Sequence, residues 1–96
     1  MNKTVNIALQ VLPTSSKHHP YDLVDKAIEV IAASGIPYQV TPFETVMEGS
    51  YEEIMAVVKK AQEACYAAGA ESCMTYIKIQ SSLSDVTIDD KMHKYK

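Results

Sequence analysis

The side chains best suited to specific recognition lie in residues 35–49, which read GIPYQVTPFETVMEG. This stretch places a hydroxyl group, on Thr45, and a carboxylate, on Glu48, just before a predicted helix. A hydroxyl donates and accepts hydrogen bonds, whereas an ionised carboxylate accepts them. Such a pair could recognise a small polar molecule, so we expect any ligand contacts to centre here.

Thr45 and Glu48 also have a purely structural explanation, since Thr-x-x-Glu is the spacing of a helix capping box. However, Ser50 and Glu53 repeat that spacing immediately before the apolar run of the helix. One helix needs one such box, which leaves Thr45 and Glu48 available for a ligand. The ring of Tyr38 could stack on a flat heterocycle. A core or interface position for Tyr38 is the alternative.

Other reactive side chains give little support to catalysis or metal binding. Cys65 and Cys73 are not in C-x-x-C spacing, and both fall on predicted core faces. His18 and His19 are adjacent and His93 is distant, without the spacing of a zinc site. The chain also lacks a G-x-S-x-G elbow and a glycine-rich phosphate loop. We therefore predict that the protein is not an enzyme and uses no cofactor.

The composition indicates one globular domain over residues 1–96. Hydrophobic residues make up 47% of the chain, and the net charge is −3. All nine cationic side chains are lysines, and arginine is the commonest base-reading residue, so nucleic acid is not an expected partner. No apolar run reaches the roughly 20 residues of a membrane span. Nor does the N-terminal sequence have the apolar core of a signal peptide. We expect a cytoplasmic protein without a membrane partner.

Six segments with alternating strand and helix patterns must position these side chains. Residues 4–12 alternate apolar and polar, which predicts a strand that Pro13 ends. A helix is predicted from Pro20 to the left-handed cap at Gly35. Two strands follow, at 36–42 and 45–48, and the first is an edge strand because of its proline. A second helix runs from Ser50 to Gly69, and a last strand covers 71–80. Residues 81–87 read as a polar linker, and 88–96 as a short amphipathic helix or a frayed tail.

The order β-α-β-β-α-β favours an α+β, ferredoxin-like sandwich. We predict a four-stranded antiparallel sheet, in strand order 4-1-3-2, with both helices on one face. The other face would be mixed in character, which suits packing between subunits or a ligand-lined cavity. We expect a homo-oligomer, with Gln10 as a further ligand contact on this face. The residues on it are Asn6, Ala8, Gln10, Leu12, Met74, Tyr76 and Lys78.

The chain resembles the small thiamine-binding, YkoF-like proteins of ferredoxin-like fold. The most specific match is the frame G-x-x-Y-x-V-x-P-x-x-T-x-x-E-G over residues 35–49. The segments IALQVLP at 7–13, TYIKI at 75–79 and DKM at 90–92 also match. Family members commonly carry arginine near strand four, where this chain has Ser72, Ser81 and Ser82.

This resemblance implies a non-enzymatic binder of thiamine or its hydroxymethylpyrimidine portion, built from homodimers that pair into tetramers. Glu48 could then accept from the amino group of the pyrimidine, and Thr45 could bond a ring nitrogen. Tyr38 or Phe43 could stack on the ring.

Two other classes of function stay open at this point. An ACT-like regulatory or interaction module would bind an amino acid or a partner protein at a sheet interface. An enzyme of the acylphosphatase type is the weakest candidate, because it is expected to need an arginine phosphate clamp.

Overall fold

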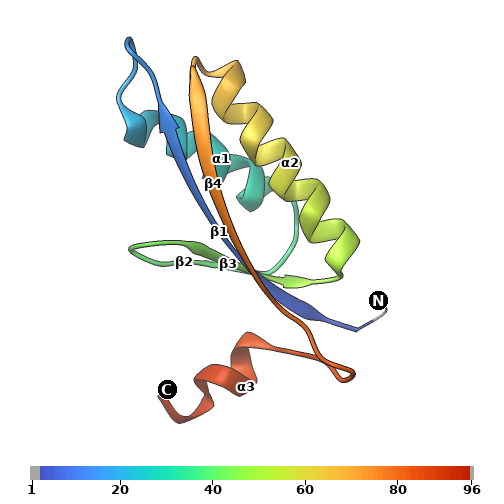
Figure 1. Cartoon of the computed structure of the whole chain (residues 1–96). Helices are drawn as coiled ribbons and strands as arrows, with labels where there is room; N and C mark the ends of the chain where they lie inside the picture. The colour runs from blue at the N-terminus through green and yellow to red at the C-terminus, as the bar shows by residue number, and fades with distance from the viewer. Residues whose placement is uncertain (1–2, 96) are drawn as a thin grey trace.

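A computed structural model of the chain describes residues 3–95 (Figure 1). Its strands are β1 (Val5–Thr14), β2 (Tyr38–Val40), β3 (Thr45–Gly49) and β4 (Ser72–Gln80). Its helices are α1 (Pro20–Ala33), α2 (Tyr51–Ala67) and α3 (Ile88–Met92), and a 3-10 turn (His93–Tyr95) follows α3.

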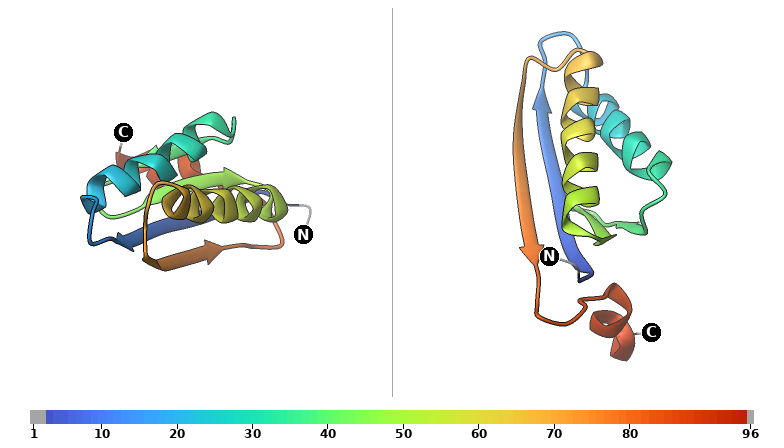
Figure 2. Two further views of the ribbon diagram at one scale, coloured as in Figure 1. Left: turned by 90° about the horizontal axis from the view of Figure 1, so that it is seen from above. Right: turned by 90° about the vertical axis from the view of Figure 1, so that its right-hand side faces the viewer.

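The four strands form one antiparallel sheet in the order β2-β3-β1-β4. Read from the other edge, this is the predicted order 4-1-3-2. Both α1 and α2 cover the same face of the sheet, as Figure 2 shows. The predicted ferredoxin-like α+β fold is therefore confirmed. None of the helices in the described part of the chain is long and apolar enough to cross a membrane.

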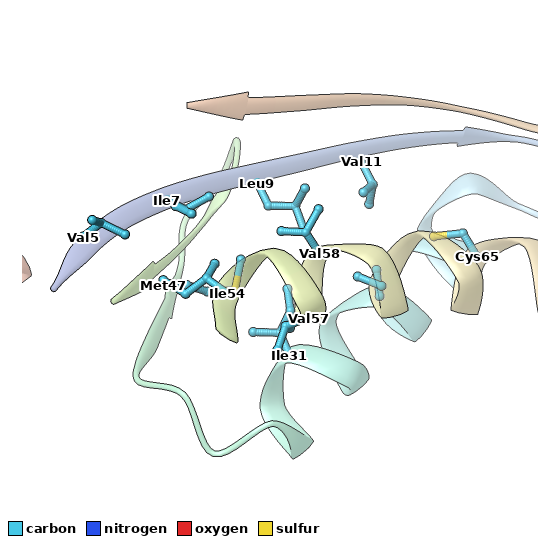
Figure 3. Close-up of a cluster of buried hydrophobic side chains, with 12 residues drawn as sticks. Val5, Ile7, Leu9, Val11, Ile31, Met47, Ile54, Val57, Val58 and Cys65 are labelled. Atoms are coloured by element: carbon cyan, nitrogen blue, oxygen red, sulfur yellow. The ribbon is translucent and has the colours of Figure 1, made fainter. Parts of the chain in front are cut away.

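The core lies between this covered face and the two helices (Figure 3). Ile7 on β1 stands between Met47 and Ile79, and its side chain is fully buried. The predicted stripe on α2, which includes Ile54 and Cys65, packs against it. Ile79 faces the same side but stays partly exposed, because β4 is an edge strand that the helices cover incompletely.

The predicted helix ends are confirmed by their hydrogen bonds. The Glu53 backbone N–H donates to the Ser50 hydroxyl at 3.3 Å, and that hydroxyl donates to the Glu53 carboxylate at 2.9 Å. Gly69 has φ +116°, and the Ala70 N–H donates to the Cys65 carbonyl at 3.0 Å. This closes α2 with a Schellman motif, as a glycine at that position permits.

Two strand boundaries differ from the prediction. The β1 strand continues through Pro13, because its pairing with β3 ends at Leu9 while its pairing with β4 continues to Thr14. A residue without an N–H is tolerated where one side of the strand is unpaired. The β2 strand is shorter than residues 36–42, since Pro37 and Pro42 flank the paired region and cannot donate to a neighbour.

The C-terminal segment is more firmly attached than a polar linker would be. Val86 is buried, and its N–H donates to the Thr4 carbonyl at 2.9 Å. The Asn6 amide donates to the Val86 carbonyl at 3.0 Å. This segment leads into the predicted short helix, α3, which lies on the opposite side of the β2–β3 hairpin from α1 and α2 (Figure 1). Lys96, at the end of the predicted helix, lies outside the described residues.

Candidate ligand site

A cavity of about 290 Å³ opens between α1, the second half of β1 and the β2–β3 hairpin. We call it the main cavity. It forms where β3 stops pairing with β1, so that the hairpin tip and α1 flank a free stretch of β1. Its inner wall is apolar, with side chains that include Leu9, Val11, Ala27 and Ile31. Its volume is at the lower end of the range for small-molecule pockets, about 300 to 1,000 Å³.

Thr45 supplies a polar group to this apolar wall. It stands opposite Leu9 in the sheet and therefore faces the helix layer, where it is only 6% exposed. Its hydroxyl forms no hydrogen bond within the part of the chain that the structure describes. A hydroxyl in such an apolar place gains most from a partner, because burying it without one costs free energy.

Two aromatic side chains from different elements line the cavity at its exposed edge. Phe43, at the tip of the hairpin, is 80% exposed, and Tyr21, in the first turn of α1, is 74% exposed. The Thr41 hydroxyl fixes the tip by accepting from the Phe43 N–H at 3.4 Å and donating to the Glu44 carbonyl at 2.6 Å. The ring of His19 packs against that of Tyr21, at 4.9 Å between centroids. Exposed rings at a cavity edge can enclose a flat ligand.

The five predicted ligand contacts fall into two separate groups. Gln10, Phe43 and Thr45 line the main cavity. Glu48 and Tyr38 instead line a second cavity of about 430 Å³, between the hairpin and α3. The reason is strand alternation. Thr45 and Glu48 are three residues apart on β3, so their side chains point to opposite faces of the sheet.

Glu48 has a structural role in addition. Its carboxylate accepts from the Ile88 backbone N–H at 2.6 Å, at the start of α3. A carboxylate near a helix N-terminus satisfies an otherwise unpaired donor. Glu48 therefore helps hold α3 against the hairpin, while its neighbours Tyr38, Asp89 and Met92 complete the second cavity.

Sequence reasoning missed Tyr21 as a contact of the main cavity. The signal was present, because Tyr21 stands in the first turn of α1 beside Asp22 and away from the apolar stripe. A large aromatic residue outside the stripe of an amphipathic helix needs a separate explanation.

Within residues 3–95, the two groups with clearly shifted pKa values are engaged in structural contacts. Burial, together with the neighbouring Cys73 thiol, raises the pKa of Cys65 to about 11, so Cys65 stays protonated at neutral pH. Hydrogen bonds from the hydroxyl and N–H of Ser16 lower the pKa of Glu71, which ties the loop before α1 to the start of β4. Within residues 3–95, no group of three His, Cys, Asp or Glu side chains could hold a metal ion.

Comparisons with known proteins agree on one family. A family model described as thiamine-binding protein matches residues 7–96. A UPF0045 protein of Clostridium perfringens is 40% identical over 93 residues, which cover 97% of this chain and 98% of the relative. A UPF0045 protein of Mycobacterium bovis is 38% identical over 79% of this chain and 74% of the relative.

Two solved structures of related sequence have the same fold. A domain of unknown function from Bacillus cereus is 43% identical, with a TM-score of 0.95 over 98% of this chain and 91% of the other. A Thermotoga maritima protein, described as a candidate thiamine biosynthesis or salvage protein, is 30% identical. Its TM-score is 0.88 over 97% of this chain and 99% of the other.

Proposed function

The chain belongs to the thiamine-binding protein family, and we propose that it binds thiamine or its hydroxymethylpyrimidine portion in the main cavity. It does so as a non-enzymatic, homo-oligomeric protein. The observation that carries this proposal is the combination, in one small apolar cavity, of the unpaired Thr45 hydroxyl with the exposed rings of Phe43 and Tyr21.

An aminopyrimidine suits this arrangement. The ring is flat and has two polarisable faces, which Phe43 and Tyr21 can contact from the hairpin and from α1. Its ring nitrogens accept hydrogen bonds and its amino group donates them, so either can pair with the Thr45 hydroxyl. Gln10 also lines the cavity, but its side chain points to the uncovered face of the sheet, because Leu9 and Val11 on either side of it face the helices.

Glu48 and Tyr38 line the second cavity, and Glu48 points to the opposite face of β3 from Thr45, so this cavity would bind a ligand separately from the main cavity. The thiazolium ring of thiamine is a cation, and a cation is attracted both by carboxylates and by aromatic faces. Glu48 and Asp89 both line the second cavity and bring carboxylates to it. We propose that this second cavity favours the cationic vitamin over its neutral pyrimidine portion.

The homo-oligomer would form through the uncovered face of the sheet. Leu12, Met74 and Tyr76 share that face and are all exposed in the single chain. Apolar side chains grouped on an exposed face favour packing against a partner. The family relationship and this face together support a second copy of the chain as that partner.

Calorimetric titration with thiamine and with hydroxymethylpyrimidine tests the proposal. We expect saturable binding of at least one of them. Thr45→Val keeps the size and shape of the side chain but removes the hydroxyl, so affinity should fall about tenfold, the worth of one buried hydrogen bond.

Phe43→Ala should also weaken binding, through loss of the stacked ring. Tyr66→Ala is the matched control, because Tyr66 is an exposed aromatic residue on α2 outside the main cavity. Absence of heat with both ligands, or equal affinity of the Thr45→Val protein, would contradict the proposed site.

A further inference from the structure

Two cysteine side chains from different elements meet at one end of the core. Cys65 lies in the last turn of α2, and Cys73 is the second residue of β4. The turn at Gly69 reverses the chain between them, so that α2 and β4 run side by side (Figure 2). Neighbouring residues of a strand alternate between faces, so Cys73 faces the helices while Met74 and Tyr76 do not share one side with it alone but flank the strand toward solvent. The cysteine pair therefore lies between helix and sheet, away from the face proposed for the homo-oligomer.

A side-chain hydrogen bond fixes how α2 and β4 face each other. The Gln62 amide donates to the Thr75 hydroxyl at 2.8 Å. Cys65 lies about 4.5 Å beyond Gln62 along α2. Cys73 lies about 7 Å before Thr75 along β4. Because the two elements are antiparallel, both displacements lead toward the same turn, which makes the two thiols neighbours. After burial, the Cys73 thiol is accordingly the next cause of the raised pKa of Cys65.

The two thiols differ in their access to solvent. Both are free in this structure. Cys65 is 0% exposed, and its thiol donates to the Leu23 carbonyl of α1 at 3.5 Å. Cys73 is only partly buried, since β4 is an edge strand that the helices cover incompletely. A small oxidant from solvent can therefore reach Cys73, whereas Cys65 is placed to react with what Cys73 becomes.

We propose that Cys73 and Cys65 are a site of reversible oxidation, at which hydrogen peroxide converts the two thiols into an intramolecular disulfide. In the first step the Cys73 thiolate attacks one peroxide oxygen, the O–O bond breaks, and hydroxide leaves a sulfenic acid on Cys73. In the second step the Cys65 sulfur attacks the Cys73 sulfur and the S–O bond breaks. The departing oxygen takes the Cys65 proton and leaves as water. The two sulfur atoms together lose two electrons, which the peroxide gains.

The position of Cys65 favours the second step although its thiol is protonated. A protonated thiol is a poor nucleophile in solution. A thiol held beside its target acts at a high effective concentration, however, and needs no further ordering before it reacts. The sulfenic acid on Cys73 thus meets Cys65 before other thiols. Dithiol reductants reverse the reaction, as is usual for disulfides inside cells.

The disulfide would join α2 to β4 and alter a contact with α1. The S–H group that Cys65 donates to the Leu23 carbonyl is consumed in the reaction, so α1 loses one bond to α2. Neither cysteine lines the main cavity or the second cavity. The oxidation site is therefore independent of the proposed ligand binding, and its test needs no ligand.

The test exposes the full chain to hydrogen peroxide at about pH 8, where an ordinary thiol is partly ionised. A protease that cleaves after glutamate then cuts at Glu71, between the two cysteines. Mass spectrometry without reduction should find the peptides of Cys65 and Cys73 linked, in protein that migrates as a single chain. Dithiothreitol should restore both thiols. The linked peptides are the readout, because peroxide also oxidises methionine.

Two variants separate the steps. Cys65→Ala should leave the sulfenic acid on Cys73, where dimedone traps it. Cys73→Ser should slow the loss of the Cys65 thiol about tenfold or more, because the buried thiol must then meet peroxide itself. Circular dichroism checks that both variants are folded, and the linked peptides of the wild-type protein provide a test that depends on neither variant.

Three results would overturn the proposal. The first is the absence of linked peptides from the peroxide-treated wild-type protein. The second is a link between the Cys73 residues of two chains in place of the link within one chain. The third is equal loss of the Cys65 thiol in the Cys73→Ser and wild-type proteins, which would show that Cys65 reacts without Cys73.

Discussion

At the scale of single residues, Thr45 shows how the placement of a polar group indicates its role. A threonine on the buried side of a strand normally donates to a nearby carbonyl or is replaced by an apolar residue. Here the hydroxyl faces a cavity instead, opposite Leu9 and near the exposed ring of Phe43. The ligand-binding role proposed for Thr45 follows from this placement.

The structure separates two residues of the 35–49 segment that the sequence pattern groups together, Thr45 and Glu48. The sequence pattern pairs Thr45 and Glu48, because the second capping box at Ser50 leaves both without a capping role. The pairing neglected that residues three apart in a strand face opposite sides. Had the strand prediction for 45–48 been applied to the side chains, the division into two groups would have followed.

The two cysteines should differ in reactivity, because Cys65 is buried and Cys73 is partly exposed. Treatment of the folded protein with iodoacetamide at about pH 8 should modify Cys73 first, since the raised pKa and burial of Cys65 suppress its thiolate. Mass spectrometry of peptides after limited reaction measures the order. Faster modification of Cys65 would show that the core is open there.

The same thiol sets a pH dependence of stability. The pKa of Cys65 in the folded protein lies above the pKa in the unfolded chain, so the folded state favours the neutral thiol. Its contribution to stability is complete below the unfolded pKa and declines as pH rises toward about 11. Urea unfolding of the Cys65→Ser and wild-type proteins at neutral and alkaline pH measures this effect. The variant should lose less stability than the wild-type protein between neutral and alkaline pH.

At the scale of elements, the boundaries of the helices were well predicted and those of the edge strand were not. Helix ends depend on local groups, such as the hydroxyl of Ser50 and the conformation of Gly69, which the sequence shows directly. The length of β2 depends on how many of its backbone groups form hydrogen bonds with β3. That number is set by the partner strand and cannot be read from the sequence of β2 alone. The docking of Val86 beside Thr4 likewise joins residues distant in sequence.

The turn after α2 gives a sharp test of local packing. A Cβ atom on Gly69 would approach the His18 ring to 2.6 Å, and the φ of +116° is unfavourable for other residues. A Cβ atom on Gly35, at φ +80°, would meet nothing within 4 Å. Gly69→Ala should therefore destabilise the protein by about 1 kcal/mol more than Gly35→Ala, which carries the conformational cost alone.

Chemical unfolding measures both variants. The double variant Gly69→Ala with His18→Ala should recover part of the loss, since it removes the clash but leaves the conformational strain. Equal destabilisation by Gly69→Ala and Gly35→Ala would contradict the close approach of His18.

At the scale of the whole molecule, the fold leaves one sheet face for partners and ligands. The covered face is buried at its central strands, where Ile7 and Met47 lie fully buried beneath the helices. The uncovered face carries the exposed side chains of Met74 and Tyr76. The element order predicted this division, because two helices on one side of a four-stranded sheet leave the other side free.

A charge on this face should disrupt the proposed homo-oligomer. Tyr76 is 52% exposed in the single chain and stands opposite Gln10 on the uncovered face. Tyr76→Lys would place a charge within an apolar contact, which should weaken association about tenfold or more. Light scattering across a concentration series measures the change, with Tyr66→Lys on α2 as the control. A wild-type protein that stays monomeric at all concentrations would contradict the oligomer.

The most direct test of the central claim is a crystal structure of the protein grown with hydroxymethylpyrimidine. Our account predicts ligand density in the main cavity, with a ring nitrogen or the amino group within hydrogen-bond distance of Thr45 Oγ1 and the ring beside Phe43. A ligand bound at another place, with the main cavity empty and Thr45 still unpaired, would contradict it.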